Sequence, residues 1–185
     1  MKNLNIFLIG FLTLFASIAL LGCASKPADE LEMAQLAMNE AIDNQASEYA
    51  PYDWDRAQMN WQMANALIRM GRYDEAREIL VKAVGNFNKA RDLSSRRLES
   101  LKIEINGMLP VLKKEVALLR QISENPQKSA KMRRKIEEAL PIINEKVSSM
   151  NASLDREDYL LARRYGQEAL RYTQDLKKRL GIDQG

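Results

Sequence analysis

The sequence contains no histidine and a single cysteine among its 185 residues. Histidine is the side chain most often used as a base near neutral pH and a common ligand of transition metals, so its absence removes both roles. A single cysteine excludes an intramolecular disulfide, and the absence of histidine excludes a cysteine–histidine catalytic pair. Glycine-rich phosphate loops and Asp-x-Asp-x-Asp calcium loops are missing as well. We therefore expect neither an enzyme nor a cofactor.

Proline and glycine are also scarce, with five and eight residues respectively. Runs of β-branched residues that alternate with polar ones are missing, whereas Ala, Leu, Met, Glu, Lys, Gln and Arg dominate the chain after Pro27. This composition predicts an all-α protein. Because the apolar residues recur at helical spacing in long stripes, we expect elongated antiparallel helical hairpins packed along one another.

The N-terminus has the pattern of an export signal. A short positive lead that includes Lys2 precedes a largely apolar run over residues 4–21, and small residues then flank Cys23. The run is just long enough for a transmembrane anchor, which is the alternative reading, although Thr13 and Ser17 dilute it.

Leu20-Leu21-Gly22-Cys23 resembles the bacterial lipobox, although Leu21 is bulkier than the residue usual at its position. The resemblance implies that residues 1–22 are removed and that the Cys23 thiol carries a diacyl lipid of the palmitate class. No aspartate follows Cys23, and in terms of this resemblance that favours the outer membrane, with the protein on the periplasmic face.

Glycine and proline also mark the expected helix boundaries. Pro51 is suited to the first position of a second helix, and Gly71 to its C-terminal cap. A third helix should begin at about Tyr73 and continue until a turn or kink at Gly107 and Pro110.

Asn125-Pro126 is the clearest break in the second half, Pro141 predicts a kink, and the last helix should run from about Arg156 to Gly181. These signals divide the chain into a signal peptide (1–22), an N-terminal helical hairpin domain (23–106), a connecting helix and turn (107–126) and a C-terminal helical hairpin (127–185).

The two hairpins match at a constant offset of 86 residues. Tyr73 and Arg77 of the third helix correspond to Tyr159 and Arg163 of the last, with alanines at equivalent positions. The alternative is that two unrelated amphipathic hairpins share this spacing, but the identical residues favour an internal repeat.

The stretch from Met70 to Ala76 resembles the turn and second helix of a tetratricopeptide repeat, in which glycine caps the first helix and tyrosine packs over the turn. The third helix is too long for that family, and two units are fewer than the three a solenoid needs. Residues 23–90 more closely resemble short bacterial helical lipoproteins of the domain-of-unknown-function family 4398. The residues that carry this resemblance are Tyr49-Ala50-Pro51, Trp54, Ala57, Gly71, Tyr73, Ala76, Leu80 and Ala83. It implies an envelope location and a helical hairpin, without established chemistry.

The charge is uneven. Residues 24–80 carry five basic and eleven acidic side chains, whereas residues 81–185 carry twenty-two basic and fourteen acidic ones. The densest basic stretch, residues 128–135, is interpreted either as a solvated helix face or as a contact with anionic lipid headgroups or cell-wall polymer. Aromatic residues do not interleave this stretch, so we do not expect nucleic-acid binding.

One cluster of large side chains is the best candidate for a binding surface, and consists of Tyr52, Trp54, Met59, Trp61, Met63 and Met70. It is either the core of the hairpin or a docking groove, because methionine-rich faces adapt to partner helices. The residues expected to bind a partner are Trp54, Trp61, Met63, Tyr73, Arg133 and Arg134.

The combined features predict a lipid-anchored, non-catalytic protein that acts as an adaptor or assembly factor for another envelope protein. The alternative is a structural lipoprotein that spaces or links the outer membrane and the cell wall. The long apolar stripes also leave room for homo-oligomers.

Overall fold

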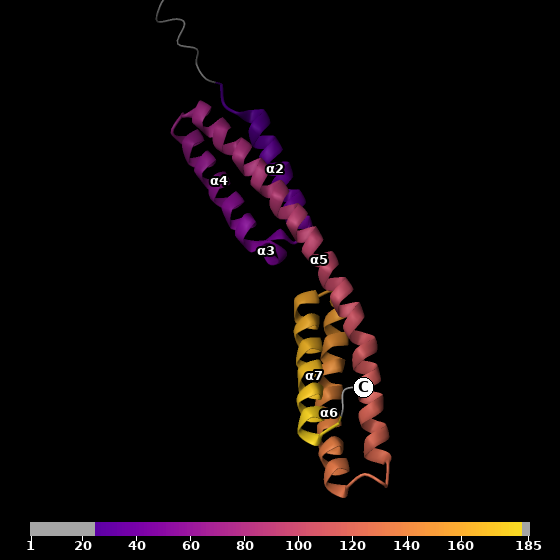
Figure 1. Ribbon diagram of the computed structural model, residues 1–185. Helices are drawn as coiled ribbons and strands as arrows, with labels where there is room; N and C mark the ends of the chain where they lie inside the picture. Colours follow the sequence, from indigo (N-terminus) through magenta and orange to yellow (C-terminus); the bar gives the residue numbers. More distant parts are fainter. Residues whose placement is uncertain (1–24, 183–185) are drawn as a thin grey trace, which may run out of the picture. The chain divides into compact units, whose positions relative to one another are not determined.

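The computed structural model describes residues 25–182, and within that range the chain forms six α-helices and no strand (Figure 1). The all-α prediction is therefore confirmed. The expected signal peptide and the lipidated Cys23 lie outside the described residues. The chain divides after Leu93 into two compact units, each with its own hydrophobic core.

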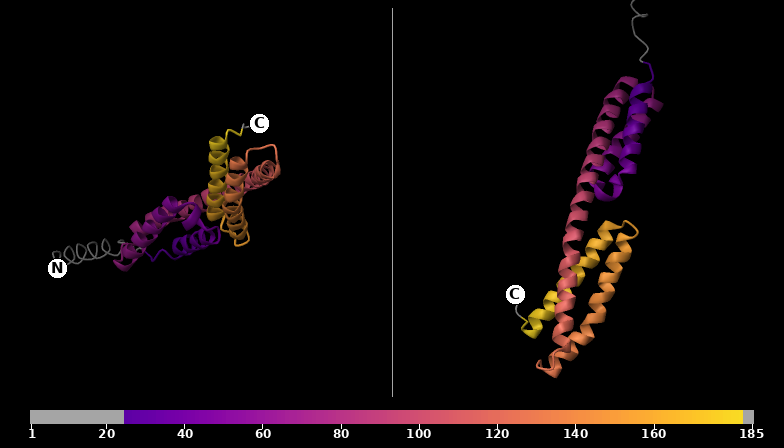
Figure 2. Two further views of the ribbon diagram at one scale, coloured as in Figure 1. Left: turned by 90° about the horizontal axis from the view of Figure 1, so that it is seen from below. Right: turned by 90° about the vertical axis from the view of Figure 1, so that its right-hand side faces the viewer.

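Unit 1 contains helices α2 (Ala28–Asp43), α3 (Ala46–Tyr49) and α4 (Pro51–Arg69), together with the first part of helix α5, residues 73–93. The chain runs along α2, returns along α4 and reverses again into α5, so α4 is antiparallel to both of its neighbours (Figures 1 and 2). Apart from the four-residue helix α3, unit 1 is thus an arrangement of three long helical segments, in the order expected from the sequence.

The predicted boundaries in unit 1 are confirmed. Pro51 occupies the first turn of α4, where its missing N–H costs no hydrogen bond. Gly71 adopts a φ of 72°, the left-handed conformation that favours glycine, and α5 begins at Tyr73. The tight turn between α4 and α5 depends on this glycine.

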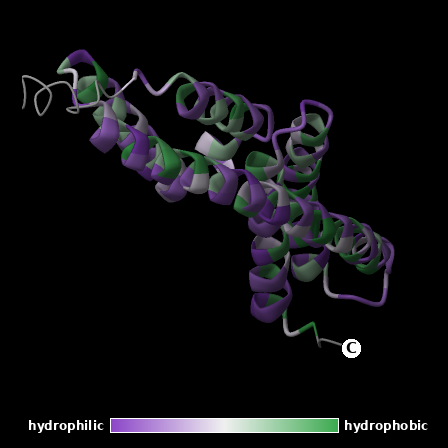
Figure 3. Cartoon of the chain, turned by 90° about the horizontal axis from the view of Figure 1, so that it is seen from above, coloured by the Kyte–Doolittle hydropathy of each residue, from purple (hydrophilic) through white to green (hydrophobic). Residues whose placement is uncertain are grey.

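Small residues fill most of the core of unit 1. Buried alanines from α2, α3, α4 and α5 surround Phe87, whose ring meets that of Trp54 edge to face at a centroid distance of 5.5 Å. Alanine lets helix backbones approach closely, and Phe87 supplies the volume that the alanines lack. In each unit the helices carry hydrophobic and hydrophilic residues around the same turns, which is the amphipathic pattern that such packing requires (Figure 3).

Helix α5 (Tyr73–Glu124) contradicts one expectation, because it continues without interruption through Gly107 and Pro110. A proline inside a helix costs about 3 kcal/mol through a lost hydrogen bond and a steric clash. Ile105 and Leu112, on either side of this segment, are buried in the core of unit 2, and their packing opposes that cost. Of the expected turn or kink, the turn is therefore wrong, and the change from one unit to the next falls after Leu93.

Unit 2 contains residues 94–124 of α5 with helices α6 (Ala130–Leu154) and α7 (Tyr159–Leu180). The side chain of Ser129 caps α6 by accepting a hydrogen bond from the Met132 backbone at 3.2 Å. The expected break at Asn125-Pro126 is confirmed.

The ends and interior of α6 and α7 also match the sequence. Pro141 lies inside α6 without ending it, and Gly181 caps α7 in the left-handed conformation. Asp158 caps the start of α7 by accepting a hydrogen bond from the Leu161 backbone at 3.0 Å.

Each unit contains a similar ion pair between two of its own helices. Arg77 pairs with Glu30 at 3.2 Å in unit 1, and Arg163 pairs with Glu104 at 2.8 Å in unit 2. In each case a basic residue near the start of the unit's third helix reaches an acidic residue on its first helix.

A second pair recurs about four turns further along the same helix, on nearly the same side. Arg91 pairs with Glu40 in unit 1, and Lys177 pairs with Glu115 at 3.0 Å in unit 2. Arg91 and Lys177 are again 86 residues apart. The basic residues of these pairs keep the predicted offset of 86, whereas their acidic partners are 74 and 75 residues apart, so the internal repeat stays a prediction.

Candidate docking surfaces on helix α4

The cluster of aromatic and methionine residues predicted as one surface is divided between two sides of α4. Trp54 and Trp61, seven residues apart, are partly buried and contact the core. The other four are exposed to 75 %, 66 %, 51 % and 69 % of their surface, and are Tyr52, Met59, Met63 and Met70. With ~3.6 residues per turn, their spacing of 7, 4 and 7 places them within about 40° of one another.

Trp54 serves the core. Its ring contacts Phe87, and both belong to the cluster that holds α2, α4 and α5 together. Nearby, the carboxylate of Asp53 is buried and pairs with the Lys89 ammonium at 2.7 Å, which fixes the start of α4 against α5.

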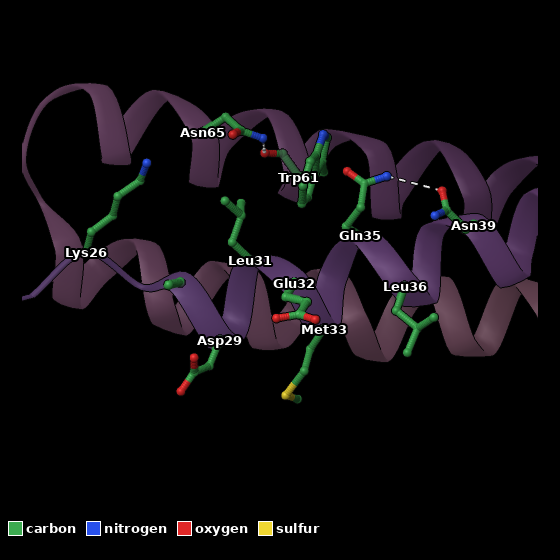
Figure 4. A pocket seen from close by; sticks show the side chains of 11 residues that line it. Lys26, Asp29, Leu31, Glu32, Met33, Gln35, Leu36, Asn39, Trp61 and Asn65 are labelled. Atoms are coloured by element: carbon green, nitrogen blue, oxygen red, sulfur yellow. Dashed lines mark hydrogen bonds between the residues drawn. The ribbon is translucent and has the colours of Figure 1, made fainter.

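Trp61 lies in a groove between α2 and α4, with a volume of about 820 Å³ (Figure 4). We call it the α2–α4 groove. The side chains of Trp61 and Leu31 point toward each other from the two helices. The lining residues are Lys26, Ala28, Asp29, Leu31, Glu32, Met33, Gln35, Leu36, Asn39, Trp61 and Asn65. The surface is thus apolar in its middle and bordered by amides and carboxylates.

The amides along the groove are partly engaged. Asn65 donates to the backbone carbonyl of Trp61 at 2.9 Å, and Gln35 donates to Asn39 at 3.1 Å. Asp29 and Glu32 add negative charge, and Lys26 adds one positive charge at the end where α2 begins. An apolar strip with a polar border is the surface that receives an amphipathic helix. Among the described residues, no group of three or more His, Cys, Asp and Glu side chains has the arrangement of a metal site.

The chain enters unit 1 beside this groove. The Arg77 guanidinium donates hydrogen bonds to the Ser25 carbonyl at 2.7 Å and to the Ser25 hydroxyl at 3.0 Å. Pro27 is fully buried, and Arg77 is itself held by Glu30. The first described residues are therefore attached to the folded unit, without a free linker between Ser25 and α2.

The other predicted binding residues occupy separate places. Tyr73 is partly buried at the start of α5, whereas Met63 is exposed on the opposite side of α4 from Trp61. Arg133 and Arg134 lie on α6 in unit 2, where Arg134 pairs with Glu138 at 2.9 Å.

The basic stretch of unit 2 borders a shallow hollow of about 500 Å³, lined by Ala130, Lys131, Arg134, Lys135 and Glu138. Lys131, Arg134 and Lys135 are all exposed there. The arrangement is compatible with both interpretations of this stretch, a solvated helix face or a contact with an anionic surface.

Two groove residues were not found from the sequence. Met33 and Leu36 are exposed on α2, beside the stripe of Leu31, Ala34 and Met38 that faces the core. Their position off that stripe, on an otherwise polar side of the helix, was the signal that could have identified them.

Shifted pKa values belong to ion pairs, some within one helix and some between helices. A hydrogen bond from Lys146, at 2.6 Å, lowers the pKa of Glu168 in unit 2. Hydrogen bonds to Asp92 and then Glu40 raise the pKa of Arg91 in unit 1. These groups stabilise helix packing.

A scan against protein-family models, a search of curated proteins and a search of solved structures found no match to the chain. Within residues 25–182, none of the helices has both the length and the hydropathy needed to span a membrane.

Proposed function

We propose that the protein is a bacterial envelope lipoprotein that acts without catalysis, as an adaptor or assembly factor for another envelope protein. The observation that carries this proposal is the α2–α4 groove, where Trp61 and Leu31 form an open apolar surface on the unit into which the N-terminus leads. Amphipathic helices bind such grooves through residues at i, i+3, i+4 and i+7.

The anchoring part of the proposal rests on the sequence around Cys23. Lipidation of Cys23 and removal of residues 1–22 would place the mature chain on the periplasmic face of the outer membrane. Ser25 is held by Arg77, so two residues separate the folded unit from the lipid, a reach of at most ~7 Å. The groove would then lie near the membrane surface.

Lipidation can be tested by mass spectrometry of the mature N-terminus. The expected product begins at Cys23 and carries acyl chains, and Cys23→Ser should leave the chain unprocessed. An intact chain that begins at Met1 in the wild type would support the uncleaved anchor instead.

The adaptor role can be tested by in-cell crosslinking, gentle solubilisation and mass spectrometry. We expect recovery of one envelope protein, lost on Trp61→Ala or Leu36→Glu. Met59→Glu is the matched control, because Met59 is exposed to a similar extent on α4 but lies outside the groove. Equal recovery from all three variants would contradict groove binding, and circular dichroism would establish that each is folded.

A structural lipoprotein remains the second candidate, supported by the 52-residue helix α5 that belongs to both units. A spacer should tolerate Trp61→Ala and Leu36→Glu, and should fail when equal lengths are removed from its helices. Recovery of only cell-wall fragments would favour this role.

A further inference from the structure

The exposed side of α4 carries a regular apolar seam. Its residues follow one another at intervals of 4, 3, 4, 3 and 4, and are Tyr52, Arg56, Met59, Met63, Ala66 and, at the C-terminal cap of the helix, Met70. This alternation is the a/d pattern with which two helices pack along each other. We propose that this α4 seam is the interface with a second copy of the same chain, and that the two α4 helices run antiparallel.

The seam is open in the folded unit. Tyr52, Met59, Met63 and Met70 are each more than half exposed, although α4 buries Ala57, Ala64 and Leu67 on another side. Four large apolar side chains aligned on one surface helix exceed the scattered exposure that monomers normally show.

The order of residues makes the seam complementary to itself when reversed. About a two-fold axis near Trp61, Tyr52 faces Met70 of the second copy, and Met59 faces Met63 of the second copy. The same axis places Arg56 opposite Ala66 of the second copy. Each layer pairs an a position with a d position, as antiparallel coiled coils require.

Arg56 distinguishes the two orientations. A parallel dimer would place Arg56 against Arg56 of the second copy, with two cations in one layer. In the antiparallel dimer Ala66 leaves space for the aliphatic stem of Arg56, whose guanidinium can extend to the solvent.

The charges beside the seam favour the same orientation. Asp55 and Arg69 lie on the same flank of α4, near opposite ends of the helix, and both are exposed. Reversal brings Asp55 against Arg69 of the second copy, and symmetry repeats the pair. Two complementary pairs would therefore flank the apolar layers.

The α4 seam and the α2–α4 groove lie on different sides of α4, since Met63 and Trp61 are two residues apart and point about 160° away from each other. A second copy on the seam would leave the groove accessible. The inference goes beyond the proposed adaptor function and does not depend on it.

The test uses the full chain in cells, with two tagged copies expressed together, one with Tyr52→Cys and the other with Met70→Cys. A short bismaleimide should join the two copies to each other, and peptide mass spectrometry should find residue 52 linked to residue 70. Either variant expressed alone should give no such dimer, because residues 52 of the two copies would lie about 27 Å apart along the helix axis. The parent protein, whose only cysteine is Cys23, measures the background.

A second variant tests whether the seam itself holds the dimer. Met63→Glu should reduce the mixed product at least tenfold, whereas Leu36→Glu, in the groove, should leave it unchanged. Links between identical positions would overturn the antiparallel arrangement, and no crosslink in any combination would overturn the dimer. The mixed product at wild-type level in Met63→Glu would also exclude the seam as its cause.

Discussion

Gly166 offers the sharpest test of how unit 2 is packed. It lies inside α7, where a Cβ atom would sit 3.0 Å from the sulfur atoms of both Met108 and Met150. Non-bonded carbon contacts are favourable near 3.5–4.0 Å, so both methionines would have to move. Both are buried, and their movement is resisted by the surrounding core. The substitution Gly166→Ala therefore forces a repacking of the α5–α6–α7 contact.

The size of the effect follows from two opposing terms. Adding a methyl group to a filled core costs about 1–3 kcal/mol, whereas replacing glycine by alanine inside a helix returns about 1 kcal/mol. We expect Gly166→Ala to destabilise unit 2 by about 1 kcal/mol. Gly107→Ala is the matched control in the same unit, because no packing neighbour outside the local helix backbone lies within 4 Å of its Cβ position. It should stabilise the unit by about 1 kcal/mol.

Thermal and urea unfolding, followed by circular dichroism, measure the difference. The two variants should differ by about 2 kcal/mol, which corresponds to roughly 8–16 °C in the Tm of a unit of about 90 residues. The transition of unit 1 should not change in either variant. If Gly166→Ala stabilised the protein as much as Gly107→Ala, the methionines would be free to yield, and the close contact at α7 would not limit packing.

Three further results are expected. Phe87→Ala should destabilise unit 1 by about 3–5 kcal/mol in urea unfolding, because it leaves a cavity where the one large buried side chain packs among the core alanines. A loss below about 1 kcal/mol would contradict that role. Lys146 lowers the pKa of Glu168, so this pair should stabilise the fold above the ordinary carboxyl pKa of 4.5 and lose its effect as the pH falls through the lowered value. In unfolding curves measured at several pH values, Glu168→Gln should reduce the loss of unfolding free energy as the pH falls. An unchanged dependence on pH would assign that loss to other carboxylates. Arg77→Gln should increase hydrogen exchange in residues 28–31, because it releases Ser25 and Glu30, whereas protection equal to wild type would show that the attachment is weak.

Helix positions were predictable where the backbone imposes them. Pro51 can occupy a first helical turn at no cost, and Gly71 adopts its left-handed conformation without strain, so both boundaries could be read locally. Pro110 shows the limit of that reasoning. Its local cost is outweighed by packing between residues far apart in the sequence, such as Leu112 and Ala169 in one core cluster. This packing energy can be recognised only in the tertiary structure.

The candidate surfaces were predictable in composition but not in arrangement. Periodicity identifies residues that share a side of a helix, and it correctly separates Trp54 and Trp61 from the seam once the helix boundaries are known. It does not say which side is covered, since that depends on the direction from which α2 and α5 approach. The contribution of Met33 and Leu36 to the groove follows from the same approach of α2.

The two sides of α4 differ in shape and in the distribution of charge, and this difference argues that they bind different partners. The α4 seam is regular, has an Arg56–Ala66 layer and is complementary to its own reverse, so a second copy satisfies it without any change in the fold. The α2–α4 groove is an open hollow formed by two helices and bordered by Asp29 and Glu32, and a hollow does not fill an identical hollow on a second copy. A surface that does not complement itself requires a different molecule. Dimer formation and partner binding should therefore be separable by substitution, with Met63→Glu affecting the first and Leu36→Glu the second.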